Sequence, residues 1–134
     1  MITKEFKYRV LYADTDAMGV VYYANYLKIY EAARADFLDQ INIPISELIK
    51  NGIVNPVIKV EIQYLQPAQF DWTVKVVSKV ERLPLAKFVF QHEMYSPENT
   101  LLNKSTVTLA FVDNKTFKAV RCPDWLIEKL ENFF

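Results

Sequence analysis

Residues 12–34 read YADTDAMGVVYYANYLKIYEAAR, and this stretch decides how the rest of the chain is arranged. It holds two aspartates, one of the two glycines of the chain, and a run of apolar and tyrosyl residues before a helical pattern begins near Ala24 or Asn25. Apolar side chains then recur at i, i+4, i+7 and i+11, which predicts a buried helix of about 15 residues, roughly 22 Å long. These side chains are Tyr26, Tyr30, Ala33 and Phe37. A loop that carries carboxylates therefore leads into the start of a buried helix.

The remainder of the chain is dominated by runs in which apolar and polar residues alternate, the pattern of half-buried strands. One run precedes the opening stretch at residues 5–12, and four follow it, at residues 58–64, 72–81, 87–95 and 102–112. Consecutive runs joined by short turns predict an antiparallel meander. The order of the elements predicts an α+β fold in which the helix covers one face of a sheet.

Two shorter helices are predicted outside this pattern. Residues 46–52 favour a helical turn, with Ser46 as its N-cap and Gly52 as its C-terminal stop. Pro123 opens an apolar tail, residues 123–130, with the spacing of a packing helix. No repeat, low-complexity tract or linker interrupts the chain, so we expect residues 1–134 to form a single domain.

The composition excludes several kinds of partner. Lys+Arg and Asp+Glu both number 16, which argues against nucleic acid because polyanion binding usually leaves a basic excess. Hydrophobic residues make up 51% of the chain and aromatic residues 14%, so apolar surface must be covered and we expect a homo-oligomer. No apolar run is long enough to span a bilayer and the charged start shows no signal peptide, which predicts a cytoplasmic protein without a membrane partner.

Scarce histidine and glycine exclude much of the usual catalytic chemistry. With only Gly19 and Gly52, the chain has no glycine-rich phosphate loop and no nucleophile elbow. Its one histidine, His92, lies in mid-strand on an apolar face and is predicted to pack as a structural side chain. A lone histidine and the single Cys122 give no metal site and no disulfide, so no metal or bound cofactor is expected.

Carboxylate chemistry remains, and Asp14 and Asp16 lie just ahead of the helix start. A helix N-terminus exposes unpaired backbone N–H groups that stabilise an anion, which acyl transfer requires at the carbonyl oxygen. Asp16 is the better candidate to attack a carbonyl or to activate water because it is closer to the helix. From the residues alone, both aspartates also fit an ordinary role in turns and helix capping. Glu31 and Arg34, spaced i, i+3, likewise fit an ordinary helix pair.

The motif as a whole resembles a known family. It comprises residues 14–22, DTDAMGVVY, then Asn25-Tyr26 and residues 31–34, EAAR, with a weaker likeness at residues 64–68, YLQPA, and at Asp71. On these residues the chain resembles the hotdog-fold acyl-CoA thioesterases of the 4-hydroxybenzoyl-CoA thioesterase family. The order of the predicted elements is similar along essentially all 134 residues.

The resemblance implies a fold, an assembly and a catalytic group. The fold is the hotdog, in which a five-stranded antiparallel sheet wraps around one long central helix. Subunits of this kind dimerise through the sheet, giving a homodimer or homotetramer with active sites at the interface. Asp16 matches the catalytic carboxylate of the family, which acts as nucleophile or general base toward the thioester. The backbone N–H of Tyr23 matches the group that polarises the thioester carbonyl.

The substrate is expected to meet the same motif and two basic residues. Arg82 and Lys87 are expected to contact the phosphates of a nucleotide arm. Tyr23 departs from the many members that have histidine there, and a phenol with a pKa of about 10 is a poor base, which leaves proton transfer to Asp16. Four residues of the motif are expected to bind substrate: Gly19, Val20, Tyr22 and Asn25.

These features predict an acyl-CoA thioesterase that releases the free acid and CoA, or that acts on the corresponding acyl-carrier-protein thioester. The alternative hypothesis is a non-catalytic hotdog module that binds acyl thioesters or a protein partner. A hotdog dehydratase would need a histidine at the site, and His92 is not expected there.

Overall fold

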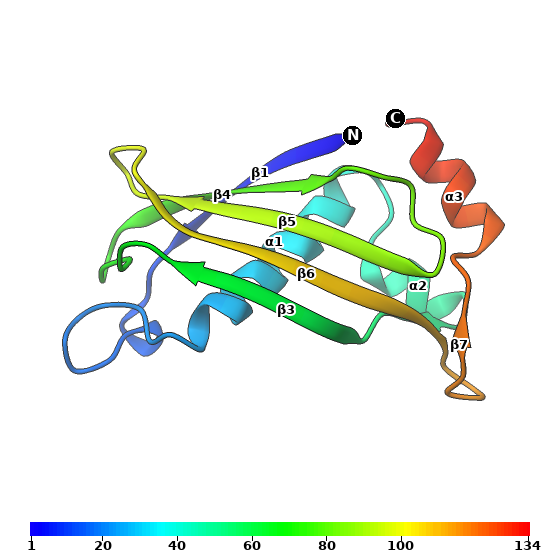
Figure 1. The fold of residues 1–134 in the computed structure, drawn as a ribbon, viewed down its shortest axis with the longest axis horizontal. Helices are drawn as coiled ribbons and strands as arrows, with labels where there is room; N and C mark the ends of the chain where they lie inside the picture. The colour runs from blue at the N-terminus through cyan, green and yellow to red at the C-terminus, as the bar shows by residue number, and fades with distance from the viewer.

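The long helix begins and ends close to where the sequence predicts. In the computed structural model, which describes residues 1–134, the helix α1 spans Asn25–Gln40 and has 16 residues. Its predicted apolar face is buried at Tyr26, Tyr30, Ala33 and Phe37. The helix lies across one face of a curved antiparallel sheet (Figure 1), which confirms the predicted α+β class.

Five long strands and two very short ones form the sheet. The two-residue strands β2 (Ile53–Val54) and β7 (Ala119–Val120) pair with the end of β6. They bring the sheet to seven strands in place of the predicted five, because two residues show no alternation that a sequence pattern could reveal. The long strands are β1 (Ile2–Arg9), β3 (Val57–Tyr64), β4 (Thr73–Val80), β5 (Lys87–Tyr95) and β6 (Leu101–Asp113).

The strand order corrects the predicted meander. β4, β5 and β6 are consecutive neighbours, but β3 pairs with β6 and not with β4, so the long strands lie in the order β1-β4-β5-β6-β3. The segment between β3 and β4 crosses the start of α1, where the backbone N–H of Val21 donates to the Ala68 carbonyl at 2.8 Å. Alternation of apolar and polar residues identifies a strand, whereas contacts with segments distant in sequence determine which strand it pairs with.

The short helix α2 spans Ile45–Lys50 and begins one residue earlier than predicted. Pro44 is its N-cap residue and its carbonyl accepts the first amide hydrogen bonds, so the prediction of Ser46 as the N-cap is wrong. Proline suits this position because the N–H that it lacks would have no partner in the helix. The predicted stop at Gly52 is confirmed by a φ of 81°, which glycine adopts without strain.

Two clusters of apolar side chains fill the space between α1 and the sheet. One is built around Phe37, Phe88 and Phe90, and Phe37 meets Phe90 edge-on with ring centroids 5.3 Å apart. The other surrounds Tyr26 and Tyr30 at the start of the helix. The helix is therefore the element on which both halves of the core are assembled.

The C-terminal helix α3 spans Asp124–Glu131 and buries Leu126 and Leu130, which confirms the predicted packing helix. Cys122 lies buried just before it, and burial raises the pKa of its thiol to about 12, with the charge of Asp124 adding to the rise. None of the helices combines the length and the hydropathy that crossing a bilayer requires.

His92 is buried beneath α1, as the sequence predicts. Its Nδ1 lies 2.8 Å from Ser78 Oγ, and its ring stacks on Tyr30 with centroids 4.8 Å apart. Burial lowers the pKa of His92 from 6.5 to about 3, and the positive charge of Arg34 adds to this effect. The ring therefore stays neutral near pH 7 and serves as a packed, hydrogen-bonded side chain.

The neutral buried ring predicts a pH-dependent stability. In the unfolded chain His92 takes up a proton near its ordinary pKa of 6.5, whereas in the folded protein it stays neutral down to about pH 3. Its contribution is therefore fully present above pH 6.5 and is lost as the pH falls from there toward 3. Between pH 7 and pH 5 we expect the free energy of unfolding, measured with urea, to fall by about 2 kcal/mol. An equal fall in His92→Gln, which can still bond to Ser78, would contradict this assignment.

Candidate active site

The loop between β1 and α1 is held by the buried carboxylate of Asp14. This residue is 2% exposed, and its Oδ2 accepts hydrogen bonds from the Tyr8 hydroxyl at 2.7 Å and from the Leu11 backbone N–H at 2.8 Å. These bonds draw residues Tyr12–Asp14 into a short 3-10 helix, so β1 ends at Arg9 and not at the predicted residue 12. Burial raises the pKa of Tyr8 to about 12, and its hydrogen bond to Asp14 adds to the rise.

The backbone of Asp14 also fixes the start of α1. Its carbonyl oxygen accepts hydrogen bonds from the Tyr22 backbone N–H and from Asn25 Nδ2, each at 2.9 Å. Asn25 is the first residue of the helix, so its side chain joins the helix to the loop. The side-chain amide of Asn25, a predicted substrate-binding residue, therefore donates to the loop and helps to fix the start of α1.

Asp16 lies at the exposed turn of the same loop. Its backbone N–H donates to the Val20 carbonyl at 3.0 Å, and the Gly19 N–H donates to the Asp16 carbonyl at 3.1 Å. Gly19 has a φ of 76° with open space around it, so the backbone conformation, and not crowding, requires glycine. Asp16 Oδ1 accepts a hydrogen bond from the Met18 N–H at 2.8 Å, and Oδ2 accepts none from the chain. The carboxylate is therefore oriented and keeps one oxygen for a ligand.

The first turn of α1 carries backbone N–H groups that the chain does not use. No side chain caps this helix. The N–H groups of Tyr22 and Asn25 are hydrogen-bonded, but those of Tyr23 and Ala24, between them, donate to no acceptor of the chain. Such groups lie at the positive end of a helix dipole and stabilise an anion placed there. The donor predicted at Tyr23 is therefore available.

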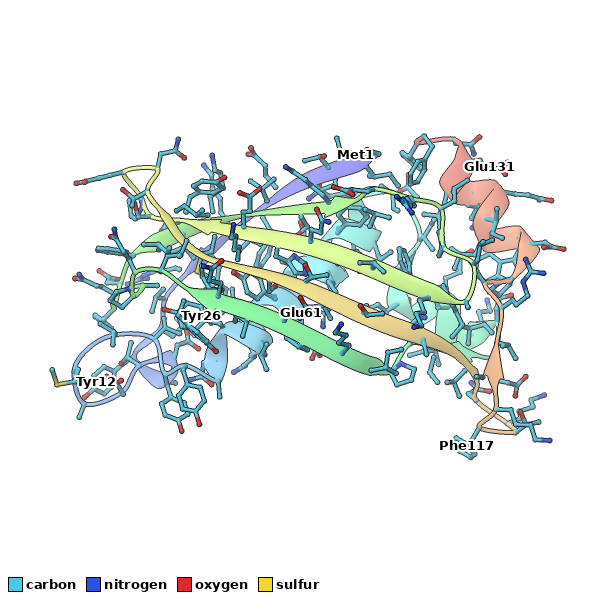
Figure 2. The ribbon with its side chains drawn as sticks, in the orientation of Figure 1. Met1, Tyr12, Tyr26, Glu61, Phe117 and Glu131 are labelled. Atoms are coloured by element: carbon cyan, nitrogen blue, oxygen red, sulfur yellow. The ribbon has the colours of Figure 1, made fainter.

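Tyrosines from α1 and β3 line the space beside Asp16. Tyr64, at the end of β3, donates its hydroxyl to the Tyr23 carbonyl at 2.9 Å and meets Tyr26 edge-on with centroids 5.5 Å apart. Burial raises the pKa of Tyr26, a backbone N–H that bonds to its hydroxyl opposes the rise, and the charge of Asp16 adds to it. Figure 2 shows Tyr26, at the start of α1, beside the loop that carries Tyr12.

Exposed aromatic rings surround the turn. The rings of Tyr22 and Tyr23 lie 4.7 Å apart, and Tyr12 meets Phe70 edge-on at 5.7 Å. These rings are largely open to solvent, which is unusual for side chains of such apolar area. Tyr22, predicted to bind substrate, therefore stands on a surface that can cover an apolar or aromatic group.

Comparison with known proteins decides the family. Residues 10–130 match the family described as the thioesterase-like superfamily. The chain belongs to this superfamily. It is 33% identical over 120 residues to the putative acyl-CoA thioesterase YneP of Bacillus subtilis (strain 168), with 87% of each chain covered. It is 37% identical over 120 residues to the acyl-CoA thioesterase YbgC of Haemophilus influenzae, with 88% of this chain and 87% of that relative covered.

Solved structures have the same fold. A DHNA-CoA thioesterase from Staphylococcus aureus superposes with a TM-score of 0.90 at 29% identity, covering 98% of this chain and 91% of that one. A 4-hydroxybenzoyl CoA thioesterase superposes with a TM-score of 0.84 at 20% identity, covering 95% and 97%, and this likeness concerns the fold alone. The predicted hotdog fold, the family resemblance and the prediction of a thioester hydrolase are confirmed.

The two basic residues predicted to contact phosphates lie far from Asp16 within this thioesterase chain. Arg82 lies in the turn after β4, and Lys87 opens β5. Figure 1 shows that turn at the opposite end of the sheet from the loop that carries Asp16. One chain therefore does not bring the carboxylate and the basic residues together. No three His, Cys, Asp or Glu side chains lie close enough to hold a metal ion.

Sequence reasoning gives little weight to the segment between β3 and β4, which packs against the loop of the candidate site. The Phe70 N–H donates to the Gly19 carbonyl at 3.0 Å, and Val20, a predicted substrate contact, forms a β-bridge with Gln69. This segment therefore supports the turn of Asp16 from outside. The weak family likeness at residues 64–68 and at Asp71 is the signal in the sequence that points to it.

The two aspartates of the loop are expected to differ in their effect on stability. Asp14→Ala should lower the free energy of unfolding by about 2–3 kcal/mol, because it removes a buried acceptor of two hydrogen bonds. Asp16→Ala should change it by less than about 0.5 kcal/mol, since that carboxylate is exposed. Denaturant unfolding followed by circular dichroism measures both, and equal losses would contradict the structural role of Asp14.

Proposed function

We propose that this thioester hydrolase cleaves an acyl-CoA to the free acid and CoA, with Asp16 as its catalytic carboxylate. The observation that carries the proposal is the free oxygen of Asp16 beside an uncapped helix start. The names of relatives support CoA as the carrier, since YneP and YbgC are described as acyl-CoA thioesterases.

The backbone N–H of Tyr23 would stabilise the negative charge that develops on the thioester oxygen. Removing one such donor typically costs roughly 2.7–4 kcal/mol of barrier height. Its neighbour at Ala24 is equally unused by the chain, so two donors are available at the same helix start. The Tyr23 side chain takes no part in this step, because the donor belongs to the backbone.

Asp16 would act in one of two ways. As a nucleophile, its carboxylate oxygen attacks the carbonyl carbon, the carbon–sulfur bond breaks, CoA leaves as the thiolate, and water then hydrolyses the anhydride. As a general base, the carboxylate takes a proton from a water that attacks the same carbon, and the same bond breaks. Both routes consume one water and yield the acid and the thiol.

Two copies of the chain would pair through β3 to complete the site. β3 has a neighbour on one side only, and Val57, Ile58, Val60 and Tyr64 are exposed along it. An open edge of this length and apolarity favours pairing with another strand. We therefore propose a dimer in which the β3 strands of two copies run antiparallel.

This pairing would bring the phosphate contacts to the carboxylate. Val57 pairs with Leu109 and Lys87 with Ala110, so the start of β3 and the start of β5 share one end of the sheet. In an antiparallel pair that end lies beside the Tyr64 end of the second copy, where α1 begins. Arg82 and Lys87 of one copy would thus face the end of the molecule that holds Asp16 of the other.

Asp16→Asn is expected to keep the fold and the oligomer while lowering kcat/KM for acyl-CoA by at least about 100-fold, since the amide neither attacks nor takes a proton. A thiol-release assay over a panel of acyl-CoA substrates measures this. Asp39→Asn, which changes an exposed carboxylate at the other end of α1, should have normal turnover. Near-normal hydrolysis by Asp16→Asn would overturn the assignment. Tight binding of acyl-CoA by the wild-type protein without any release would instead support a non-catalytic module.

Val60→Glu is expected to dissociate the dimer and to abolish most hydrolysis, because it places a charge at the centre of the proposed contact. Sedimentation velocity and the thiol-release assay measure the two effects. Thr3→Glu makes the same change on the other edge strand, β1, and should leave both the assembly and the activity intact. A fully active monomer of Val60→Glu would contradict a site shared between two copies.

A further inference from the structure

An apolar cavity lies between the latter half of α1, α2 and the sheet. Its volume is about 370 Å³, and ten of its thirteen lining residues are hydrophobic. Leu38, Leu48, Phe88 and Phe90 form much of its wall. A cavity of this size and apolarity suits a small organic group. Its lining includes neither Asp16 nor Tyr23 of the same chain.

Arg34 gives this apolar pocket a single buried positive charge. The side chain lines the pocket and is 7% exposed, and its nitrogen atoms, which keep some contact with solvent, form no salt bridge or hydrogen bond with the chain. Burial lowers the pKa of its guanidinium, and the charge of Glu31 opposes this effect from beyond salt-bridge distance. Glu31 itself is exposed at the rim. The ordinary helix pair that the sequence suggests for these two residues is therefore not formed.

The guanidinium of Arg34 would be stabilised by a hydrogen-bond acceptor in this apolar pocket. Burying a charge without a partner is costly, and arginine presents five N–H donors in a fixed fork that suits oxygen acceptors. The buried groups on the sheet beneath Arg34 include His92, which is neutral and carries no compensating charge. An oxygen that a ligand brings into the pocket would supply such a partner.

The position of the pocket explains which ligand would reach it. Val57, the first residue of β3, lines the pocket, and Tyr64, the last, bonds to the start of α1. In the antiparallel pairing of two β3 strands, the pocket of one copy adjoins the helix start of the other. A thioester held at Asp16 of one copy would then extend its acyl group toward the pocket of its partner.

We propose that this pocket receives the acyl group of the substrate and that Arg34 binds an oxygen at its far end. This inference rests on the proposed thioesterase and its dimer. The substrate class is an acyl group with a compact apolar body and a distal hydrogen-bond acceptor, either a ring hydroxyl or a carboxylate. Arg34 is a specificity-determining residue in this scheme and takes no part in bond cleavage. An unsubstituted acyl chain would leave its guanidinium without a partner.

Two matched pairs of substrates test the proposal. Benzoyl-CoA is compared with 4-hydroxybenzoyl-CoA, and hexanoyl-CoA with adipyl-CoA, whose six-carbon chain ends in a carboxylate. In at least one pair, the wild-type protein should prefer the oxygen-bearing member in kcat/KM by about tenfold or more, and the preferred pair identifies the oxygen. Arg34→Met, which keeps the unbranched apolar stem of the side chain without its donors, should reduce that preference at least about tenfold.

Two further variants separate recognition from structural support. Arg34→Lys retains a positive donor and should keep part of the preference, whereas Lys28→Met removes a charge from the exposed side of α1 and should leave the preference unchanged. Equal losses for both members of each pair in Arg34→Met would show that Arg34 only supports the fold, and would overturn the proposal. If that variant does not fold, an unchanged preference in folded Arg34→Gln overturns it equally.

The proposed function and this inference fail in different ways. Hydrolysis without any preference in either pair would leave the thioesterase standing and refute the role of Arg34. If no acyl-CoA is hydrolysed, calorimetry with non-hydrolysable thioether analogues of the same pairs tests binding in the pocket independently of catalysis. Equal affinity of the wild-type protein and Arg34→Met for the oxygen-bearing analogues would then refute it.

Discussion

The geometry of the candidate site depends on one buried carboxylate, that of Asp14. The side chain of Asp14 accepts hydrogen bonds from the Tyr8 hydroxyl and the Leu11 N–H. Its backbone carbonyl accepts hydrogen bonds from the Tyr22 N–H and the Asn25 side-chain amide. These contacts join the end of β1 to the start of α1 and set the path of the loop between them. The exposed turn of Asp16 and the free N–H groups of the helix both follow from that path.

The two aspartates illustrate how far sequence reasoning reaches. The scarcity of histidine and glycine leaves their loop as the one credible place for chemistry, and proximity to the helix favours Asp16. Which carboxylate is buried depends on the Tyr8 hydroxyl, whose position is set only when β1 packs beneath the loop. The family resemblance also favours Asp16, because it summarises contacts that spacing along the chain does not contain, and the catalytic role of Asp16 stays a prediction.

Local sequence patterns predicted the helices and strands themselves better than they predicted which strands pair. The apolar period of α1 and the alternation of the four later long strands gave nearly correct bounds, because burial of one face acts on each residue in turn, whereas β1 lies three residues earlier than the predicted residues 5–12. The pairing of β3 with β6 and the pocket around Arg34 escaped prediction, since both arise from segments distant in sequence. The i, i+3 spacing of Glu31 and Arg34 suggested a bond that burial of one residue and exposure of the other prevent.

The two edge strands of the sheet, β1 and β3, differ in the side chains that they expose, and this difference bears on how many copies can pair. β3 exposes four large apolar side chains among its polar residues, at Val57, Ile58, Val60 and Tyr64, whereas the exposed positions of β1 are Thr3, Glu5, Lys7 and Arg9. Once two β3 strands pair, both outer edges of the joined sheet are β1 strands, whose charged side chains disfavour a further strand. In the proposed dimer, two charged outer edges would therefore favour a closed two-fold assembly, whereas an apolar β1 would permit a fibre.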